Sequence, residues 1–148
     1  MAKIRGYRQI NGRWGQLWWD GELIAEVEDF EAKIVPQRED VEMAGELDVD
    51  SKITSLKGEG TMKLKHIYSR GKNKLVKAWI AGKDPRSQLL GKLKDPDAYG
   101  TESTTINNVW FNEITIMQFT KGLLTRDFPF GFTPSDVDMP DLIEDTEG

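Results

Sequence analysis

Residues 15–37, GQLWWDGELIAEVEDFEAKIVPQ, contain the strongest fold signal in the chain. Asp20-Gly21 separates two apolar runs and predicts a two-residue β-hairpin turn, because both residues tolerate positive φ. The strand after the turn has apolar side chains on both faces, with Ile24, Phe30, Ala32 and Ile34 on one face and Leu23, Ala25, Val27 and Val35 on the other. The pattern therefore predicts a sheet that is contacted from two sides.

The next segment, residues 36–57, has the sequence PQREDVEMAGELDVDSKITSLK and shows no clean period. We predict a long loop here. Loops of this length are uncommon in compact domains and are usually functional or disordered. The loop has apolar residues that need a burying surface, namely Val41, Met43, Leu47, Val49, Ile53 and Leu56. An internal hairpin is the alternative interpretation.

Beyond this loop the sequence predicts four more strands, at residues 58–68, 87–95, 104–119 and 124–132. A helix is expected between the first two, with Ser69 as N-cap and Gly82 as its end. Its apolar face consists of Leu75, Val76, Trp79 and Ile80. The expected fold is a single α+β domain over residues 1–148, a mostly antiparallel β sandwich or barrel with one packed helix. Residues 1–14 read as a polar arm, and residues 134–148 as an acidic, extended tail.

Opposite charges are segregated along the chain. Residues 17–51 contain twelve acidic and two basic residues, a net charge of −10. Residues 52–94 contain twelve basic and two acidic residues, a net charge of +10. A nucleic-acid binder usually has a basic excess overall, whereas this chain has a net charge of −5. Such blocks are typical of pairing between segments or between copies of a chain.

The sequence offers little support for catalysis or metal binding. Cysteine is absent, which excludes disulfides and zinc–thiolate sites, and His66 is the single histidine. Glu26, Glu28, Asp29 and Glu31 could bind a hard cation or form an acid–base pair, but a solvated or pore-facing sheet surface is the commoner setting for such residues. No phosphate-binding loop is present. We therefore expect a protein that is not an enzyme and has no metal or cofactor.

Three features occur in one order along the chain. They are the WWDG hairpin with its EVEDFEA strand (residues 18–32), GEGTMKLKHIYS before the helix (58–69), and DFPFGFTPSDVDMPD near the end (127–141). The strand TESTTINNVWFNEITI (101–116) precedes the last of them. This order resembles the tail-tube proteins of contractile phages, defective prophages and phage-tail-like bacteriocins of Gram-positive bacteria. The similarity covers roughly residues 15–145.

The resemblance implies a structural subunit that assembles with itself. In that family, six copies form a ring, strands of neighbouring copies join into one inner β-barrel, and rings stack into a tube inside a contractile sheath. It implies that the loop at residues 36–57 reaches an adjacent ring. The implied partners are further copies and the sheath, baseplate and tail-terminator proteins. DNA passes through a phage tube without sequence-specific binding, and ions pass through a bacteriocin needle.

Glu26, Glu28, Asp29 and Glu31 are the candidate lining of an acidic lumen, where carboxylates would repel DNA phosphates. Synthesis in the bacterial cytoplasm is expected, because no secretory signal or apolar run of about 20 residues is present. The resemblance implies that the chain becomes part of a virion tail or of an extracellular tail-like particle. A monomeric β-type module that binds carbohydrate or peptide through tryptophans is the alternative, and the tube of another contractile injection machine is a third.

Overall fold

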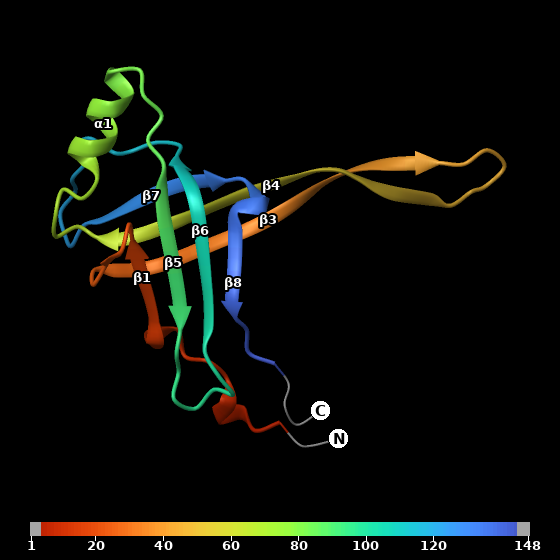
Figure 1. Cartoon of the computed structure of the whole chain (residues 1–148), viewed down its shortest axis with the longest axis horizontal. Coiled ribbons are helices and arrows are strands. Elements are labelled where there is room, and N and C mark those ends of the chain that lie inside the picture. The colour runs from red at the N-terminus through yellow and green to blue at the C-terminus, as the bar shows by residue number, and fades with distance from the viewer. Residues whose placement is uncertain (1–3, 145–148) are drawn as a thin grey trace.

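The computed structural model describes residues 4–144 (Figure 1). Eight strands, one α-helix and three short 3₁₀ helices follow one another in this part of the chain. In chain order they are η1 (Gly6–Arg8), η2 (Gly12–Trp14), β1 (Gly15–Trp19), β2 (Glu22–Leu23), β3 (Val27–Glu42), β4 (Val49–Lys65), α1 (Lys72–Ile80), β5 (Ser87–Leu93), β6 (Glu102–Phe111), β7 (Thr125–Phe132), η3 (Pro134–Asp136) and β8 (Val137–Asp141). This mostly antiparallel β fold with one short helix confirms the predicted fold class. None of the helices within residues 4–144 has the length and apolar character needed to span a membrane.

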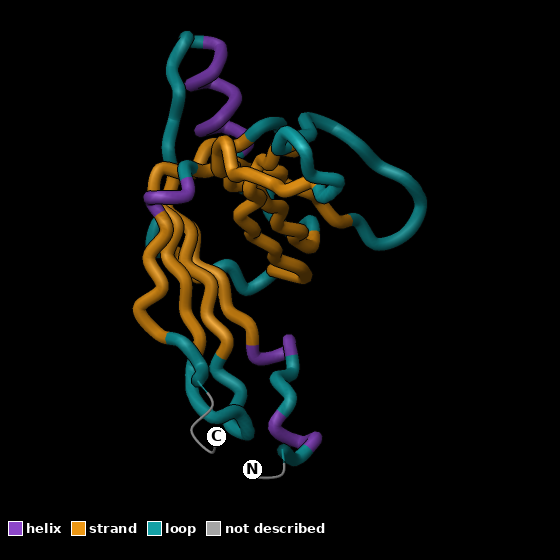
Figure 2. Tube along the Cα trace, turned by 90° about the vertical axis from the view of Figure 1, so that its right-hand side faces the viewer, coloured by secondary structure: helices purple, strands orange, loops and turns teal. Residues whose placement is uncertain are grey.

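The strands form two layers that share β6. The order is β2-β1-β5-β6-β7-β4-β3, and β8 pairs with β6 outside this path. β6 pairs with β5 along most of its length but with β7 at Trp110 and Phe111, and Asn108 between them has a positive φ of 55°. In Figure 1, β1, β5, β6 and β8 run across the direction of β3, β4 and β7, and Figure 2 shows the two groups of strands as separate layers. This is the crossed arrangement of two packed sheets.

The core lies between the layers and is rich in aromatic rings. The ring centroid of Phe111 lies 5.0 Å from that of Trp19 and 6.4 Å from that of Phe130, and Phe30 stacks on Phe130 at 5.8 Å. Aromatic pairs at these separations stabilise a core beyond the area they bury. The buried apolar residues are Leu17, Trp19, Ile24, Met62, Leu64, Leu75, Leu89, Ile106, Val109, Phe111, Phe128, Phe130 and Phe132.

The turn at Asp20-Gly21 is confirmed, but the strand after it is divided. Asp20 and Gly21 both have positive φ, 51° and 83°, and connect β1 to β2. β2 ends at Leu23, and β3 begins only at Val27. The break places Ile24 in the core, where its amide donates a hydrogen bond to the Leu17 carbonyl at 2.8 Å. One long strand from residue 22 onward is therefore a wrong prediction.

Residues 36–57 form paired strands, in contrast to the predicted irregular loop. The β3–β4 register continues from Val35↔Lys57 through Pro36↔Leu56 to Glu42↔Val49, with one irregularity after Gln37. Pro36 is compatible with this strand because β3 is an edge strand. The sequence shows no period here because most residues of both strands are exposed in the single chain, so alternation does not separate a buried face from a solvated one.

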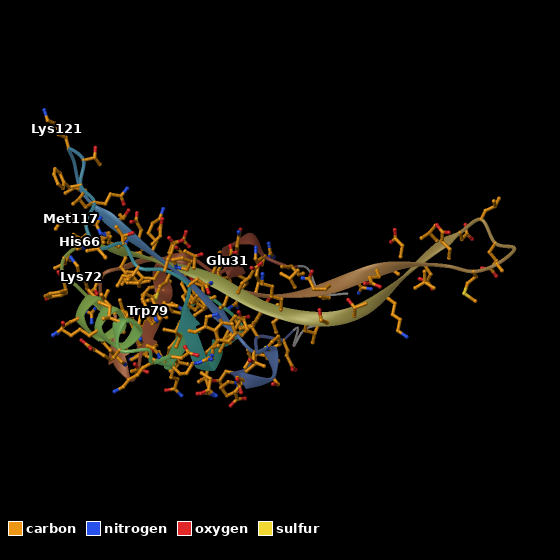
Figure 3. All side chains as sticks on the ribbon, turned by 90° about the horizontal axis from the view of Figure 1, so that it is seen from above. Glu31, His66, Lys72, Trp79, Met117 and Lys121 are labelled. Atoms are coloured by element: carbon orange, nitrogen blue, oxygen red, sulfur yellow. The ribbon has the colours of Figure 1, made fainter. Side chains whose placement is uncertain are left out.

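The helix is shorter at its start than predicted and has a narrower apolar face. Its N-cap is Gly71, at φ 74°, and not Ser69. Leu75 is fully buried, and Trp79, which Figure 3 labels, packs on the core from a partly buried position. Ile80 is 82% exposed, so its assignment to the core face is wrong. Leu75 and Trp79, spaced four residues apart, are the side chains that pack this short helix on the core, and Ile80 lies outside their stripe.

Three further boundaries differ from the predictions. The strand expected at 58–68 ends at Lys65, which leaves His66 exposed at the surface, and that expected at 104–119 ends at Phe111. Part of the expected tail at 134–148 forms β8, which pairs with β6, while residues 145–148 lie outside the described residues. Within the predicted N-terminal arm (residues 1–14), the Asn11 backbone amide donates a hydrogen bond to the Asp95 carboxylate at 2.8 Å. This part of the N-terminal arm therefore contacts the body of the domain.

Gly60 gives a test of how tightly the layers pack. A Cβ atom at this position would lie 2.2 Å from the carbonyl oxygen of Glu31 and 2.5 Å from the ring of Phe130. Because backbone and a core ring both have to move, we expect Gly60→Ala to lower the free energy of unfolding by about 1–3 kcal/mol, measured by urea denaturation. Gly100→Ala is the matched control, since nothing lies within 4 Å of its Cβ position. Equal stabilities of the two variants would contradict the packing described here.

Candidate functional site

The most unusual feature of the fold is a long two-stranded projection, which we call the hairpin arm (residues 36–56). Its strands pair without another layer on them and end in a turn where Gly45 has a φ of 83°. Figures 1 and 3 show the arm extending far beyond the two-layer body, on the side opposite to α1. An isolated two-stranded hairpin is marginally stable in water. The arm therefore needs a further surface to pack on.

The hairpin arm combines exposed apolar side chains with negative charge. Leu47 at its tip is 101% exposed. The other predicted loop residues are also mostly exposed, with only Val41 half-buried: Met43, Val49, Ile53 and Leu56. Between Arg38 and Lys52 the arm contains six carboxylates, at Glu39, Asp40, Glu42, Glu46, Asp48 and Asp50. A contiguous exposed surface of this kind is typical of an interaction site.

The body also has strand edges that are open within the described chain. β3 pairs with β4 on one side, and no described strand pairs with its other edge along its 16 residues. β8 lies at the margin of the other layer and pairs with β6 alone among the described strands. An edge strand presents unpaired backbone N–H and C=O groups, which another chain can extend. Both layers can thus accept a further strand.

A concave groove of about 810 Å³ lies beside β3 and carries three of the predicted acidic residues. Glu28, Asp29 and Glu31 line it together with Lys92 and Arg13 from the opposite wall. The register also joins the two charge blocks, since Asp29 of β3 lies opposite Lys63 of β4. All three acids are exposed in the single chain. They therefore form a solvated acidic strip along the open edge strand.

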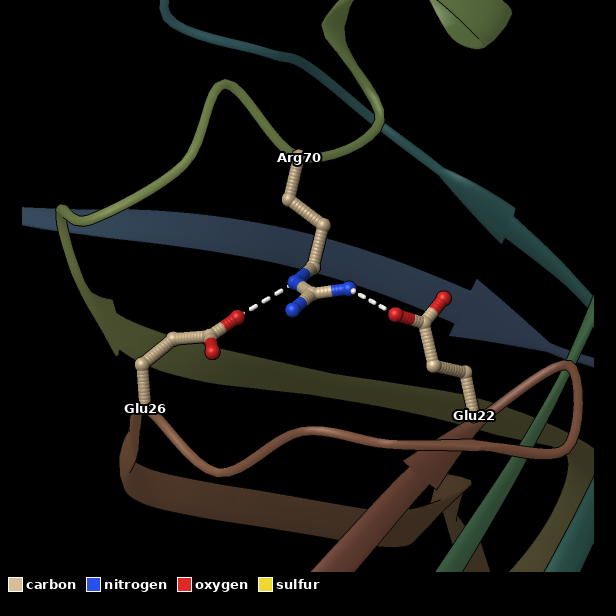
Figure 4. A network of polar contacts seen from close by, with 3 residues as sticks. All are labelled: Glu22, Glu26 and Arg70. Carbon is tan, nitrogen blue, oxygen red and sulfur yellow. Dashed lines mark hydrogen bonds and ion pairs between the residues drawn. The ribbon is translucent and has the colours of Figure 1, made fainter.

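Glu26 does not belong to this strip. It is 5% exposed and its carboxylate accepts a hydrogen bond from Nε of Arg70, as Figure 4 shows. Nη1 of Arg70 donates a second hydrogen bond, of 3.0 Å, to Glu22. The buried ion pair connects the chain before β3 to the loop that leads into α1. Glu26 was predicted as part of a lumen surface, and its burial against Arg70 corrects that prediction.

The hydrogen bond that Arg70 donates to Glu26, opposed by burial, raises the pKa of Arg70 above its ordinary value, with a further contribution from the hydrogen bond to Glu22. When folding raises the pKa of a basic group, the interactions of its charged form stabilise the fold at every pH below the unfolded-state pKa. This stabilisation is lost only as pH rises through the folded-state pKa. Arg70 therefore stays charged at every pH at which the protein is handled. Sequence analysis missed this residue, because opposite charge blocks do not indicate which acid meets which base.

A second, exposed pair supports the same corner. Nζ of Lys74 donates to Asp20 at 2.9 Å, and the Gln88 amide donates to the same carboxylate at 2.8 Å. Partial burial would raise the pKa of Asp20, but these two donors outweigh it and lower the pKa below 3.8. Because folding lowers the pKa of Asp20, its contacts with Lys74 and Gln88 stabilise the fold at pH values above the ordinary aspartate pKa. This stabilisation is lost as pH falls through the folded-state pKa of Asp20.

The described residues do not assemble a recognisable catalytic or metal centre. Within residues 4–144, no three His, Asp or Glu side chains are grouped so that they could hold a metal ion. The tryptophans do not share one face either: Trp19 is in the core, and the rings of Trp18 and Trp110 lie under Lys92 and Arg86 at 5.7 and 4.8 Å. What the geometry offers for function is the hairpin arm, the open edges and the acidic strip.

Proteins similar to this chain in sequence or fold include a protein of a phage-like element and chains of tail-like particles. The chain is 28% identical over 146 residues to the phage-like element PBSX protein XkdM of Bacillus subtilis (strain 168), with 97% of this chain and 98% of that one covered. Its fold is similar to a chain of the anti-feeding prophage tube-terminating cap (TM-score 0.65, 8% identity, 96% and 93% covered). It is also similar to a chain of the tail of an empty gene transfer agent particle with C6 symmetry (TM-score 0.55, 10% identity, 94% and 100% covered).

The family model described as phage tail tube protein matches residues 2–141, which is nearly the whole chain. The two-layer β body has an open strand edge and a projecting arm, and an open edge can pair with a strand of another chain. This chain belongs to the phage tail tube protein family and is a tail-tube-type structural subunit.

Proposed function

We propose that the chain builds the inner tube of a contractile phage tail or of a phage-tail-like particle, as rings of six copies that stack on one another. The observation that carries the proposal is the open edge of β3, which leaves backbone groups of residues 27–35, the part of this strand in the body, available for strand pairing. Closing the sheets around a ring removes such edges, which an isolated sheet leaves exposed. The hairpin arm then packs against the adjacent ring.

The acidic strip gives the tube a lining. Glu28, Asp29 and Glu31 lie on β3, the edge strand that ring closure uses, so we place them on the wall of the passage. Carboxylates there repel the phosphates of DNA in a phage, which lets DNA slide, and attract cations in a bacteriocin. A map of the assembled tube is the measurement. A lumen lined mainly by lysines such as Lys63 and Lys65 would contradict this lining.

The tube requires other particle proteins around it. We propose a contractile sheath on its outside, a baseplate at one end and a tail terminator at the other. The chain is made in the bacterial cytoplasm and ends in the virion tail or the released particle. The C6 symmetry of the gene transfer agent tail supports the ring size, and the tube-terminating cap supports the tail location.

Assembly of the purified chain tests the proposal. We expect rings and tubes in negative-stain micrographs of concentrated protein, and a mass of six chains for the smallest stable ring in size-exclusion chromatography with light scattering. A baseplate extract supplied as a nucleus controls for slow initiation. A monomer under all these conditions, together with absence of the chain from the tube of the native particle, would favour the monomeric carbohydrate- or peptide-binding module.

A further inference from the structure

A second exposed apolar surface lies at the end of the molecule opposite to the hairpin arm. The loop between β6 and β7 leaves four large apolar side chains more than half exposed, at Ile116, Met117, Phe119 and Leu123. In Figure 3, the labelled Met117, His66 and Lys72 lie close together at this end, and the arm extends from the other. Large apolar side chains exposed together in this way are typical of an interface.

The patch borders a small pocket of about 100 Å³, which we call the end pocket. Its apolar wall includes Ile114, Met117 and Phe128. Lys72 and Arg126 supply positive charge beside this wall, and Asp127 is the one carboxylate among the lining residues. Arg126 is held in place because its guanidinium donates hydrogen bonds to the backbone carbonyls of Gln118 and Thr125. The pocket thus combines an apolar wall with a basic rim.

The tip of the hairpin arm has the complementary pattern. Leu47 is fully exposed and stands between Glu46 and Asp48. An apolar side chain flanked by two carboxylates matches an apolar pocket flanked by Lys72 and Arg126. Opposite charges around an apolar contact fix its orientation and accelerate encounter.

We propose that the arm tip of one copy, centred on Leu47, docks in the end pocket of a second copy. This inference rests on the proposed function and names the surface that receives the arm. The arm tip and the end pocket lie at opposite ends of the molecule, so the contact between copies is head-to-tail. Such a contact continues along a stack of copies instead of closing between two of them. It gives the tube a direction.

Disulfide trapping tests the contact. The chain has no cysteine, so a variant with Leu47→Cys and Met117→Cys has no competing thiols. Residue 47 belongs to the arm tip between β3 and β4, and Figure 3 shows this tip and the labelled Met117 at opposite ends of the molecule. This separation prevents a bond within a chain, because a disulfide needs Cα atoms within about 7 Å. After oxidation of assembled tubes we expect a ladder of covalent oligomers on a non-reducing gel, collapsed by reductant, with residues 47 and 117 joined in the peptide map.

The matched control combines Leu47→Cys with Met139→Cys, since Met139 is 56% exposed on β8 and does not line the end pocket. Tubes that cross-link through residue 139 and not through residue 117 overturn the docking site and leave the proposed function intact. Tubes with no cross-link in either variant do the same. If the unaltered chain forms no tubes, the proposed function fails, and the docking site with it.

Charge exchange provides a second readout. Glu46→Lys with Asp48→Lys should raise the concentration needed for assembly by about tenfold or more, because like charges then meet across the contact. Adding Lys72→Glu should recover most of that loss. A Lys72→Glu change that leaves the defect unaltered counts against the end pocket as the receiving surface.

Discussion

Removal of residues 39–52, with Arg38 and Ile53 joined through an Asn-Gly turn, is expected to abolish tube formation and leave the domain folded. Arg38 and Ile53 are paired in the β3–β4 register, so a two-residue turn can close the shortened hairpin. None of the buried apolar core residues lies in the removed segment, and loop closure depends only weakly on length. We expect a thermal midpoint within a few degrees of the unaltered chain and no tubes in micrographs.

A second variant keeps the length of the arm and removes its exposed apolar side chains. Met43, Leu47 and Val49 are changed to Ser, which preserves the charge of the arm and the register of the flanking strands. We expect the same loss of tubes, because packing between copies needs these exposed side chains. If the shortened chain still stacks into tubes, the arm does not join rings, and the open strand edges alone account for assembly.

The sequence predicts those parts of the fold that local chemistry determines. Asp20-Gly21 is one such case, since few residue pairs adopt two consecutive positive φ angles, and the turn forms where predicted. Gly82, with a φ of 77°, likewise follows the end of α1. These assignments need no knowledge of distant residues. The α+β class follows from them and from the strand patterns around them.

What sequence analysis missed depends on contacts between distant segments. Alternation predicts a strand only when one face is buried, and the hairpin arm has both faces exposed in the single chain, so residues 36–57 gave no period. Glu26 and Glu28 look alike in the sequence, yet one is buried against Arg70 and the other is exposed. The partner of Glu26 lies 44 residues away. Only the folded chain distinguishes the two acids.

Arg70→Met is expected to be the most destabilising of the single changes considered. It removes the cation that faces Glu26, whose side chain is 4% exposed, and leaves a carboxylate buried without its partner. Breaking a buried pair from one side typically costs about 3–5 kcal/mol, because the remaining charge is uncompensated. The Glu22 contact adds little, since its side chain is 70% exposed. Urea denaturation of the free subunit measures the change.

Two variants separate this effect from general loss of surface charge. Lys74→Met breaks the exposed pair with Asp20 at the same corner and should cost no more than about 1 kcal/mol. Arg70→Met combined with Glu26→Gln removes both charges and should recover a large part of the stability lost in Arg70→Met alone, because a neutral amide is less costly to bury than a carboxylate. If Arg70→Met costs no more than Lys74→Met, the Glu26–Arg70 pair does not hold the loop before α1 against the start of β3.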